Sequence, residues 1–335
     1  MSEEALPAEV ILSHADDTGE MFPELDWRWE DVLAGLMPIL AVRISVGLYP
    51  EKLQPLAIPL TVIVTTWMWF FPVVIARLRG AQLRLPPLAT SAMEAVIAIP
   101  TTMMIWIGLG IVLGITLQLF PNINQNTNPF VEPAARNLGN PLFWLFLLTA
   151  CTAGPLGEEL FFRGMIYRWL KQHVDIKSAI LLQGLLFGFV HTYGVLHSIL
   201  ASFLGIAFAT AYEWRKTLVM PICLHVMQNT VAMIATLAMA LILSTGPFLG
   251  VWGEGKQHGC QITRVEPNGS AADAGIQVGD IVAEFGSEPI TDFDSLKGAI
   301  GKYRVGDRVK MRYFRSDKMQ QVDVKLKSRN QVVED

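Results

Sequence analysis

Two adjacent carboxylates and a guanidinium occur in an otherwise apolar part of the chain, in the stretch Gly154-Pro-Leu-Gly-Glu-Glu-Leu-Phe-Phe-Arg-Gly164. A carboxylate in such surroundings can take a proton from water, which is the chemistry of a general base. Consecutive residues on a helix lie about 100° apart, so Glu158 and Glu159 face different directions. Glu159 precedes Arg163 by four residues, the spacing and order that favour an ion pair. Glu158 therefore remains as the candidate base.

Two later segments each add a histidine. Phe187 lies four residues before His191, and Asn229 lies four residues after His225. Taken alone, a histidine in an apolar helix is usually a packing residue, and an asparagine often only links membrane helices. Three apolar helices that each carry acidic, basic or amide groups instead indicate a site, because such groups are costly in a membrane and persist where they have a task.

These side chains could supply what peptide hydrolysis needs, which is an activated water, a proton acceptor and donors for the oxyanion. We expect Glu158 to be the base and His191 to orient the same water. His225 and Asn229 are expected to donate hydrogen bonds to the oxyanion. An alternative is a zinc ion held by Glu158, His191 and His225, which are suitable ligands. The chain contains no His-Glu-x-x-His segment, which favours the metal-free glutamate mechanism without a cofactor.

The composition predicts a membrane protein. Hydrophobic residues make up 52% of the 335 residues and charged residues 17%, and the mean hydropathy is +0.39. The fold class expected is an all-α polytopic membrane helix bundle of about seven spans, surrounded by lipid. The net charge of −4 argues against a nucleic-acid partner. The apolar stretches are Val32–Tyr49 (with Arg43 inside it), Pro55–Ala76, Ala95–Phe120, Pro141–Leu170 (with a break expected near Gly154-Pro155), Ser178–Val190, Leu196–Trp214 and Leu218–Leu243.

The distribution of basic residues predicts an orientation, because cytoplasmic loops carry an excess of lysine and arginine. Residues 1–30 form an acidic tail without the features of a signal peptide, and Trp27 and Trp29 are expected to anchor the chain at the membrane interface. We expect a multi-pass plasma-membrane protein, of a bacterial inner membrane, with the C-terminal domain extracytoplasmic. The residues placed on the cytoplasmic side are Arg77, Arg79, Arg84, Arg168, Lys171, Lys177, Arg215 and Lys216, against Lys52 and Arg136 on the other side.

A second domain is expected over residues 246–328, after a hinge at Thr245-Gly246-Pro247. Alternating apolar residues predict strands at 260–265, 281–285, 307–315 and 322–326, and short helices are expected at 270–274 and 293–300. The segments Val265-Glu-Pro-Asn-Gly-Ser-Ala-Ala-Asp-Ala-Gly275, Val278-Gly-Asp-Ile-Val282 and Phe293-Asp-Ser-Leu296 resemble a circularly permuted PDZ domain of bacterial proteases. This resemblance implies a small β-rich α+β fold that binds the C-terminus of a peptide as an added strand. The expected peptide-binding residues are Phe248, Leu249, Gly250 and Val251.

The ordered trio Glu-Glu-x-x-x-Arg, Phe-x-x-x-His and His-x-x-x-Asn resembles the CPBP family, which comprises type II CAAX prenyl endopeptidases and bacteriocin-processing and immunity proteins. The match covers residues 140–237 within a membrane domain expected over 31–244. It implies the same catalytic residues, Glu158, His191, His225 and Asn229. It also implies Glu159, Arg163 and Phe187 as structural support.

We therefore expect an intramembrane endopeptidase that acts on a protein or peptide, with a PDZ domain that assists binding of a substrate or partner. The alternatives are a zinc-dependent version of the protease and a non-catalytic, membrane-anchored scaffold that binds peptides. The complete set of motif residues favours the enzyme, because a protein that had lost its activity would tolerate the loss of one member. The three cysteines are widely spaced and are expected to be small core residues rather than a redox or zinc site.

Overall fold

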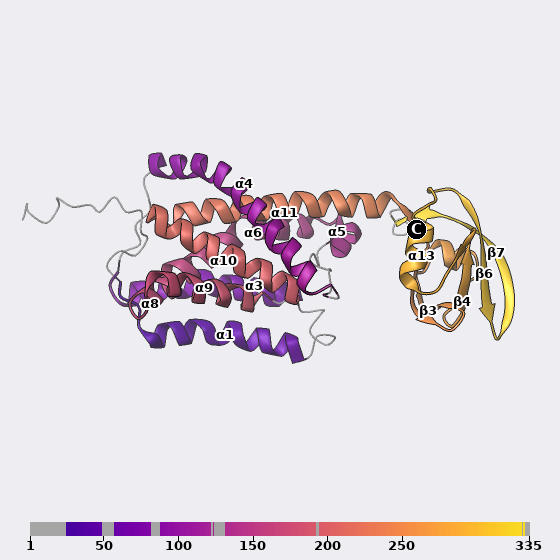
Figure 1. Cartoon of the computed structure of the whole chain (residues 1–335), viewed down its shortest axis with the longest axis horizontal. Helices are drawn as coiled ribbons and strands as arrows, with labels where there is room; N and C mark the ends of the chain where they lie inside the picture. Colours follow the sequence, from indigo (N-terminus) through magenta and orange to yellow (C-terminus); the bar gives the residue numbers. More distant parts are fainter. Residues whose placement is uncertain are drawn as a thin grey trace, which may run out of the picture. The chain divides into compact units, whose positions relative to one another are not determined.

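The computed structural model describes residues 25–48, 57–81, 88–121, 123, 131–191, 194–329 and 331. The chain divides into two compact units. One combines Met1–Asn128 with Leu145–Met233 and is helical, and the other combines Pro129–Trp144 with Ile234–Asp335 and contains the β-sheet (Figure 1).

Each of the seven predicted apolar stretches is helical over most of its described residues. Four helical segments are long and apolar enough to cross a membrane: Ser91–Leu119, Pro141–Lys171, Val195–Arg215 and Val219–Thr245. Val62–Leu78, the continuously described part of one further apolar helix, and Ile176–Val190 are shorter, so the count of seven spans stays a prediction. The helices are α1 (Trp29–Leu48), α3 (Ala57–Leu78), α4 (Leu88–Leu119), α6 (Pro141–Cys151), α7 (Ala153–Phe161), π-helix η2 (Phe162–Tyr167), α8 (Arg168–Lys171), α9 (Ile176–Val190), α10 (Val195–Arg215) and α11 (Val219–Thr245).

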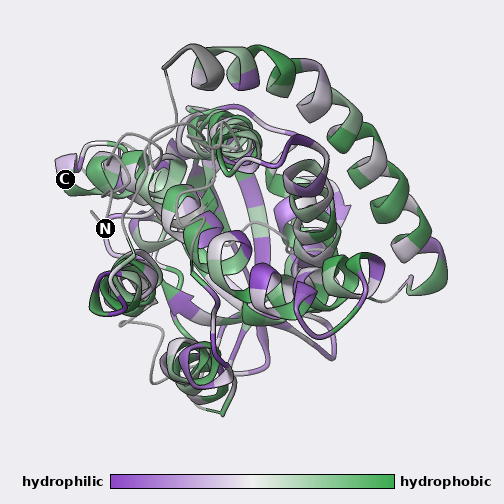
Figure 2. Ribbon diagram, turned by 90° about the vertical axis from the view of Figure 1, so that its left-hand side faces the viewer, coloured by the Kyte–Doolittle hydropathy of each residue, from purple (hydrophilic) through white to green (hydrophobic). Residues whose placement is uncertain are grey.

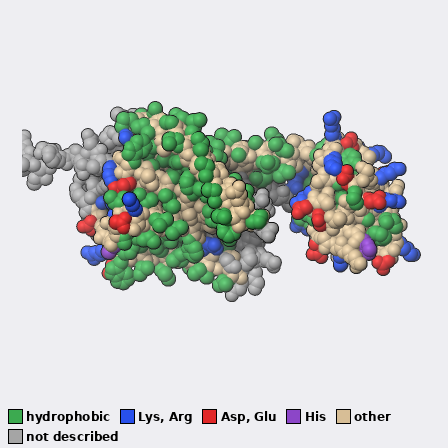
Figure 3. Space-filling model, viewed as in Figure 1, with side chains coloured by type: hydrophobic (Ala, Val, Ile, Leu, Met, Phe, Trp, Pro, Cys, Tyr) green, Lys and Arg blue, Asp and Glu red, His purple; other side chains and the backbone are tan. Residues whose placement is uncertain are grey.

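The outer surface of the helical unit is apolar. Along α4, large hydrophobic side chains such as Met104 and Ile107 are exposed. Green hydrophobic residues predominate along the helices in Figure 2 and cover most of the visible face of this unit in Figure 3, where charged side chains gather mainly towards one end. A helix that is hydrophobic all round suits lipid rather than water, which agrees with the membrane assignment.

Arg43, the charged residue inside the first apolar stretch, has a partner on another helix. Its Nε donates a hydrogen bond to the carbonyl oxygen of Phe189 at 3.0 Å, and its guanidinium lies 5.6 Å from the centre of the Phe189 ring. Phe189 belongs to the last turn of α9, where carbonyl groups lack partners within the helix and the helix dipole favours a positive charge. Arg43 thus joins α1 to the end of α9 that precedes His191.

The stretch that carries Glu158 and Glu159 is an interrupted helix. The predicted break near Gly154-Pro155 lies at Thr152, which separates α6 from α7. Pro155 has no N–H group and cannot bond the carbonyl of Cys151, so a regular ladder cannot run through this point. A second irregularity follows the carboxylates, because Phe162–Tyr167 forms a π-helix. Such π-turns are frequent at functional sites.

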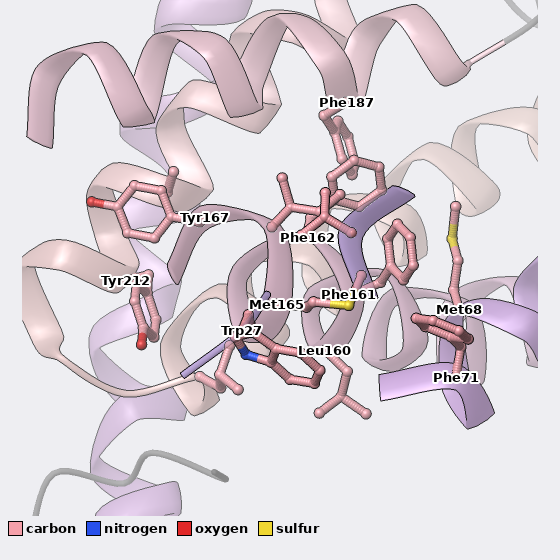
Figure 4. Close-up of a cluster of buried hydrophobic side chains, with 14 of the residues drawn as sticks. Trp27, Met68, Phe71, Leu160, Phe161, Phe162, Met165, Tyr167, Phe187 and Tyr212 are labelled. Atoms are coloured by element: carbon pink, nitrogen blue, oxygen red, sulfur yellow. The ribbon is translucent and has the colours of Figure 1, made fainter. Parts of the chain in front are cut away.

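The core of the helical unit surrounds this interrupted helix. Phe161, Phe162 and Met165 are fully buried and pack with Trp27 and Phe187 among others, as Figure 4 shows. The prediction that Trp27 anchors the chain at the membrane interface is wrong, because its side chain is only 2% exposed and lies in this core. The first 24 residues of the predicted acidic tail lie outside the described residues, as do Lys52 and Arg84 of the charge pattern.

The second unit contains the expected β-rich domain. An antiparallel sheet has the strand order β2 (Val251–Lys256), β3 (Gly259–Val265), β4 (Ile281–Phe285), β6 (Arg308–Arg315) and β7 (Lys318–Lys325), with β5 (Glu288–Pro289) beside β4. β1 (Pro247–Phe248) pairs with β8 (Lys327–Ser328) in a separate ribbon. The short helices α12 (Ser270–Asp273) and α13 (Phe293–Ile300) lie where the sequence predicted them.

Two features of this unit differ from the expectations. Residues 131–137, which lie between two of the predicted apolar stretches and for which no helix was predicted, form helix α5 (Val131–Asn137). Strand β2 was not predicted, because two glycines interrupt its alternation. Gly253 is required there, since a Cβ atom at this position would lie 2.5 Å from the sulfur of Cys260.

Candidate active site

The three motif segments meet at Glu158. The carboxylate oxygen Oε2 of Glu158, on α7, lies 3.9 Å from Nε2 of His191 and 3.8 Å from Nε2 of His225. His191 follows the last residue of α9, and His225 lies on α11. The sequence predicted this meeting from three separate helices. Both distances exceed that of a direct hydrogen bond, but one small molecule such as water can lie within bonding distance of two such atoms.

Glu159 forms the predicted ion pair with Arg163. Its Oε1 accepts a hydrogen bond of 2.9 Å from Nη1 of Arg163, and the same atom lies 2.8 Å from Nδ1 of His225. The side chains of Glu159 and Arg163 are fully buried. Arg163 also donates from Nη2 to the carbonyl oxygen of Gly205 at 2.8 Å. Glu159 therefore links the motif helix to α11, and Arg163 links it to α10.

Two aromatic rings complete the surroundings of this pair. The guanidinium carbon of Arg163 lies 4.8 Å from the centre of the Phe187 ring and 5.4 Å from that of Phe208. The same rings contact the histidines, with 4.6 Å between the centres of Phe187 and His191 and 5.1 Å between those of Phe208 and His225. Such cation–π contacts stabilise a desolvated guanidinium by about 2 kcal/mol. Phe187 thus contacts both Arg163 and His191, and its role as structural support stays a prediction.

The hydrogen bonds of His191 determine which ring nitrogen faces Glu158. Its Nδ1 lies 2.6 Å from the carbonyl oxygen of Phe187, which only accepts hydrogen bonds, so Nδ1 carries the proton. In the neutral ring, Nε2 then presents a lone pair towards Glu158. The backbone of His191 is held as well, because the hydroxyl group of Ser198 donates to its carbonyl oxygen at 3.0 Å.

Asn229 lies one turn after His225, and its side chain bonds to a backbone carbonyl group. Its Nδ2 donates a hydrogen bond of 3.0 Å to the carbonyl oxygen of Ala150, near the end of α6. A carboxamide nitrogen carries two hydrogens, so this bond uses only one of its two donors. Asn229 thus fixes α11 against the helix that leads into the motif, and one N–H group remains for another acceptor.

The two carboxylate groups of the site are not fully supplied with hydrogen-bond donors. Oε2 of Glu158 is buried and accepts no hydrogen bond from a described residue, and the same holds for Oε2 of Glu159. A buried acceptor without a donor costs roughly 1–3 kcal/mol. The structure retains this cost at the point where two imidazoles converge, which is typical of a functional position.

The side chains of this cluster include the ligand types of a zinc site. Glu158, His191 and His225 are ligand types that zinc accepts, and each histidine has its Nδ1 bound to an oxygen, as in many metal sites. Among the described residues, however, no group of three His, Cys, Asp or Glu side chains has the arrangement of a metal site. The ligand types fit and their present arrangement does not.

The predicted peptide-binding residues lie at the start of the β-sheet. Phe248 belongs to β1 and Val251 begins β2, and the side chains of Leu249 and Val251 are buried in the core. Gly250 has a φ of +80°, a conformation that glycine adopts readily. The carbonyl groups of Leu249 and Gly250 accept hydrogen bonds from the N–H groups of Ala271 and Glu266. β2 is an edge strand of the main sheet, the type of strand to which a peptide can add.

Comparisons with known families agree with both halves of this description. Residues 140–231 match the model of the type II CAAX prenyl endopeptidase Rce1-like family. Residues 247–326 match the model of the PDZ domain. The chain carries an Rce1-like domain followed by a PDZ domain. The Rce1-like match contains Glu158, His191, His225 and Asn229, and the PDZ match contains the loop from Phe248 to Val251.

Individual relatives match only segments of the chain. The YdiL protein of Bacillus subtilis, described as a membrane peptidase, is 32% identical over 93 residues, which are 28% of this chain and 38% of that protein. The periplasmic serine endoprotease DegP of Escherichia coli is 36% identical over 78 residues, 23% of this chain and 16% of that protein. The chain thus spans less than two fifths of the length of either relative. A crystal structure of the HtrA3 PDZ domain with a phage-derived ligand has 19% identity and a TM-score of 0.22, and covers 24% of this chain and 85% of that chain.

Several residues that support the site were not singled out from the sequence for that role. Phe208 contacts both Arg163 and His225, and the carbonyl group of Gly205 accepts a hydrogen bond from Arg163. Phe208 follows Gly205 by three residues on α10, which places the two on one side of that helix. The only sequence signal for them is this spacing inside an apolar run, which does not distinguish them from ordinary packing residues.

Proposed function

We propose that this protein is a membrane endopeptidase that hydrolyses a peptide bond with a water molecule activated by Glu158. The observation that supports this most directly is the buried Oε2 of Glu158, which accepts no hydrogen bond from a described residue and lies within 4 Å of Nε2 of both His191 and His225. A water molecule that donates one hydrogen to Glu158 and the other to His191 keeps a lone pair for attack on a carbonyl carbon. The Rce1-like match supports the same reaction class.

The reaction follows from these positions. The water oxygen attacks the carbonyl carbon of the scissile bond while Glu158 takes the proton that the water loses. The carbonyl oxygen becomes an oxyanion, and its proposed donors are His225 and the free N–H group of Asn229. The bond between carbon and nitrogen then breaks, and Glu158 returns the proton to the leaving amine. The products are a peptide with a new carboxyl terminus and a peptide with a new amino terminus.

Glu159 and Arg163 prepare His225 for this role. When His225 is protonated on both nitrogens, it donates from Nδ1 to Glu159 and from Nε2 towards the reaction centre. The net charge of the site is then zero, because the two carboxylates of Glu158 and Glu159 balance the two cations of Arg163 and His225. A neutral site is favourable in an apolar interior. A carboxylate that holds the far nitrogen of an imidazole fixes its orientation and stabilises the imidazolium, as in serine protease triads.

Zinc is the rival for this mechanism. If the protein uses it, Glu158, His191 and His225 would hold the ion, which would supply a Lewis acid for the same hydrolysis. Dialysis against a chelator distinguishes the glutamate mechanism from the zinc mechanism. The glutamate mechanism predicts that protein dialysed against a chelator keeps its cleavage rate and contains no stoichiometric zinc. Loss of cleavage on dialysis and its return with added zinc would establish the metal version.

The PDZ domain is proposed to bind the C-terminus of a peptide substrate or partner. The bound chain would add to the free edge of β2, and its carboxylate would lie against the N–H groups of Leu249, Gly250 and Val251. The charge pattern of the loops supports a position of this domain outside the cytoplasm. A protein without catalysis, serving only as a peptide-binding scaffold, would use the same surface and would not need the convergence of Glu158 with two histidines.

The test for catalysis compares newly formed peptide termini in membranes. Cells that lack the chromosomal gene would express the wild-type protein or the Glu158→Gln variant at matched levels, and mass spectrometry would identify the protein termini. We expect a set of new termini that requires Glu158. Identical sets of termini in the two samples would refute the endopeptidase and leave the scaffold. A synthetic peptide that spans the strongest cleavage site then provides a substrate for kinetics.

A further inference from the structure

The helical stretch 153–164, which carries the two glutamates, accepts a hydrogen bond at each end from a tryptophan side chain of another segment. Nε1 of Trp27, which precedes α1, donates a buried hydrogen bond of 2.7 Å to the carbonyl oxygen of Gly164. Nε1 of Trp69, on α3, donates one of 2.6 Å to the carbonyl oxygen of Ala153. These bonds join residues that are 137 and 84 positions apart in the chain.

Both accepting carbonyl groups belong to irregular parts of the helix. Ala153 is the first residue of α7, directly after the break at Thr152. Gly164 lies inside the π-helix η2, where the regular ladder is interrupted. A helix is least constrained by its own hydrogen bonds at such interruptions. The two indoles therefore act where the segment with Glu158, Glu159 and Arg163 would otherwise be free to turn or slide.

Glycines allow the tryptophan-bearing segments to come this close. A Cβ atom on Gly157, the residue before Glu158, would lie 2.4 Å from a ring carbon of Trp69. A Cβ atom on Gly35 of α1 would lie 2.9 Å from side-chain atoms of Phe161 and of Met165. In Figure 4 the indole of Trp27 lies beside Leu160 and Met165. The contacts on this side of the helix thus leave no room for even one added methyl group without displacement.

The direction of Glu158 depends on how this short segment is rotated. Its Oε2 lies at nearly equal distances, 3.9 and 3.8 Å, from the two imidazole nitrogens on separate helices. A displacement of about 1 Å would change these distances enough to lose a bridging water, and displacements of this size can reduce catalysis about 100-fold. Glu159 opposes rotation through Arg163 and His225, but it acts only on one face of the helix.

We propose that Trp27 and Trp69 are positioning residues for peptide hydrolysis, and that their indole N–H groups set the rotation and height of the segment that carries Glu158. Neither side chain touches the reacting atoms. The inference rests on the proposed function, because it assigns these residues a part in the same reaction. In this inference the indole N–H group positions the backbone, whereas the ring fills the core.

The test removes the N–H group and keeps an aromatic ring. Trp27→Phe and Trp69→Phe would be compared with Trp144→Phe, which loses a similar indole bond, of 2.8 Å, to the carbonyl oxygen of Leu138. Full-length protein in detergent would be assayed with the synthetic peptide that spans the Glu158-dependent cleavage site. We expect kcat to fall tenfold or more in the first two variants, with KM within about twofold, because the position of Glu158 affects the transition state. The control should keep both constants within about twofold.

A purely structural role for the tryptophans would give a different result. The fraction of folded protein would then fall, while the protein that stays folded would keep the wild-type kcat. This result would refute the inference. If phenylalanine prevents folding, 3-benzothienylalanine at position 69 keeps the bicyclic shape and lacks only the N–H group, and a kcat within twofold of wild type would also refute it. Glu158→Gln is measured in parallel. Full turnover by Glu158→Gln would refute the proposed function itself, whereas unchanged kcat in the tryptophan variants alone would refute only the positioning role.

Discussion

Removal of Glu159 should destabilise the helical unit strongly, because it leaves a fully buried guanidinium without its carboxylate. The Glu159→Ala variant removes the bonds of 2.9 Å to Arg163 and 2.8 Å to His225, while Arg163 keeps only Gly205 and its two aromatic neighbours. Breaking a buried ion pair from one side costs about 3–5 kcal/mol. A loss of 1 kcal/mol lowers the melting temperature of a domain of this size by about 2–4 °C, so we expect a fall of roughly 6–20 °C.

The assay is thermal unfolding of the full-length protein in detergent, followed by circular dichroism. The control is the double variant Glu159→Leu, Arg163→Met, which replaces both charges by apolar side chains of similar size. Such replacements are often neutral or stabilising, so the double variant should melt above Glu159→Ala. A melting temperature of Glu159→Ala within about 3 °C of wild type would contradict the reasoning. A double variant that melts lower than Glu159→Ala would contradict it as well.

Three further predictions concern the PDZ domain. Burial, with smaller contributions from the carboxylates of Asp292 and Glu254, raises the pKa of the Cys260 thiol from 9.0 to about 11. Because the folded domain favours the neutral thiol, Cys260 should contribute fully to stability below pH 9, and this contribution should be lost as the pH rises through 11. Alkylation of Cys260, followed by mass spectrometry, should therefore accelerate near pH 11. Acceleration near pH 9 would contradict this prediction. Asp280→Ala should lower the stability of the domain by about 2–3 kcal/mol, because Asp280 is buried and accepts two hydrogen bonds of 2.7 Å from Arg315. Pulse proteolysis measures the loss of stability. A loss no larger than that of the exposed control Asp323→Ala would contradict the prediction. Lys318→Cys, at the exposed first residue of β7, should react with a membrane-impermeant thiol reagent on intact cells, with wild type as background, whereas labelling only after lysis would place the domain in the cytoplasm.

The sequence predicted those features that depend on local spacing. The pairing of Glu159 with Arg163 follows from their separation of four residues, and the bounds of β4 and α13 follow from apolar alternation and helix caps. The convergence of His191 and His225 on Glu158 was predicted from the cost of polar groups in apolar helices.

Features that depend on contacts between distant segments were not predictable in this way. Trp27 is buried in a core whose members come from distant segments and bonds to Gly164, 137 residues away, and local sequence could not distinguish it from an interfacial tryptophan. The π-helix that follows the carboxylates has no sequence pattern of its own, and one of its carbonyl groups, that of Gly164, accepts a hydrogen bond from the distant Trp27.

The central claim is that Glu158 activates the water that cleaves the peptide. The measurement that tests it most directly is kcat of purified Glu158→Gln on the synthetic peptide, with its melting temperature as the control for folding. The substitution keeps the size of the side chain and removes its capacity to take a proton. We predict a fall in kcat of about 10³-fold at an unchanged melting temperature, the range typical of a lost general base. A kcat within tenfold of wild type, in protein that is equally stable, would contradict the account.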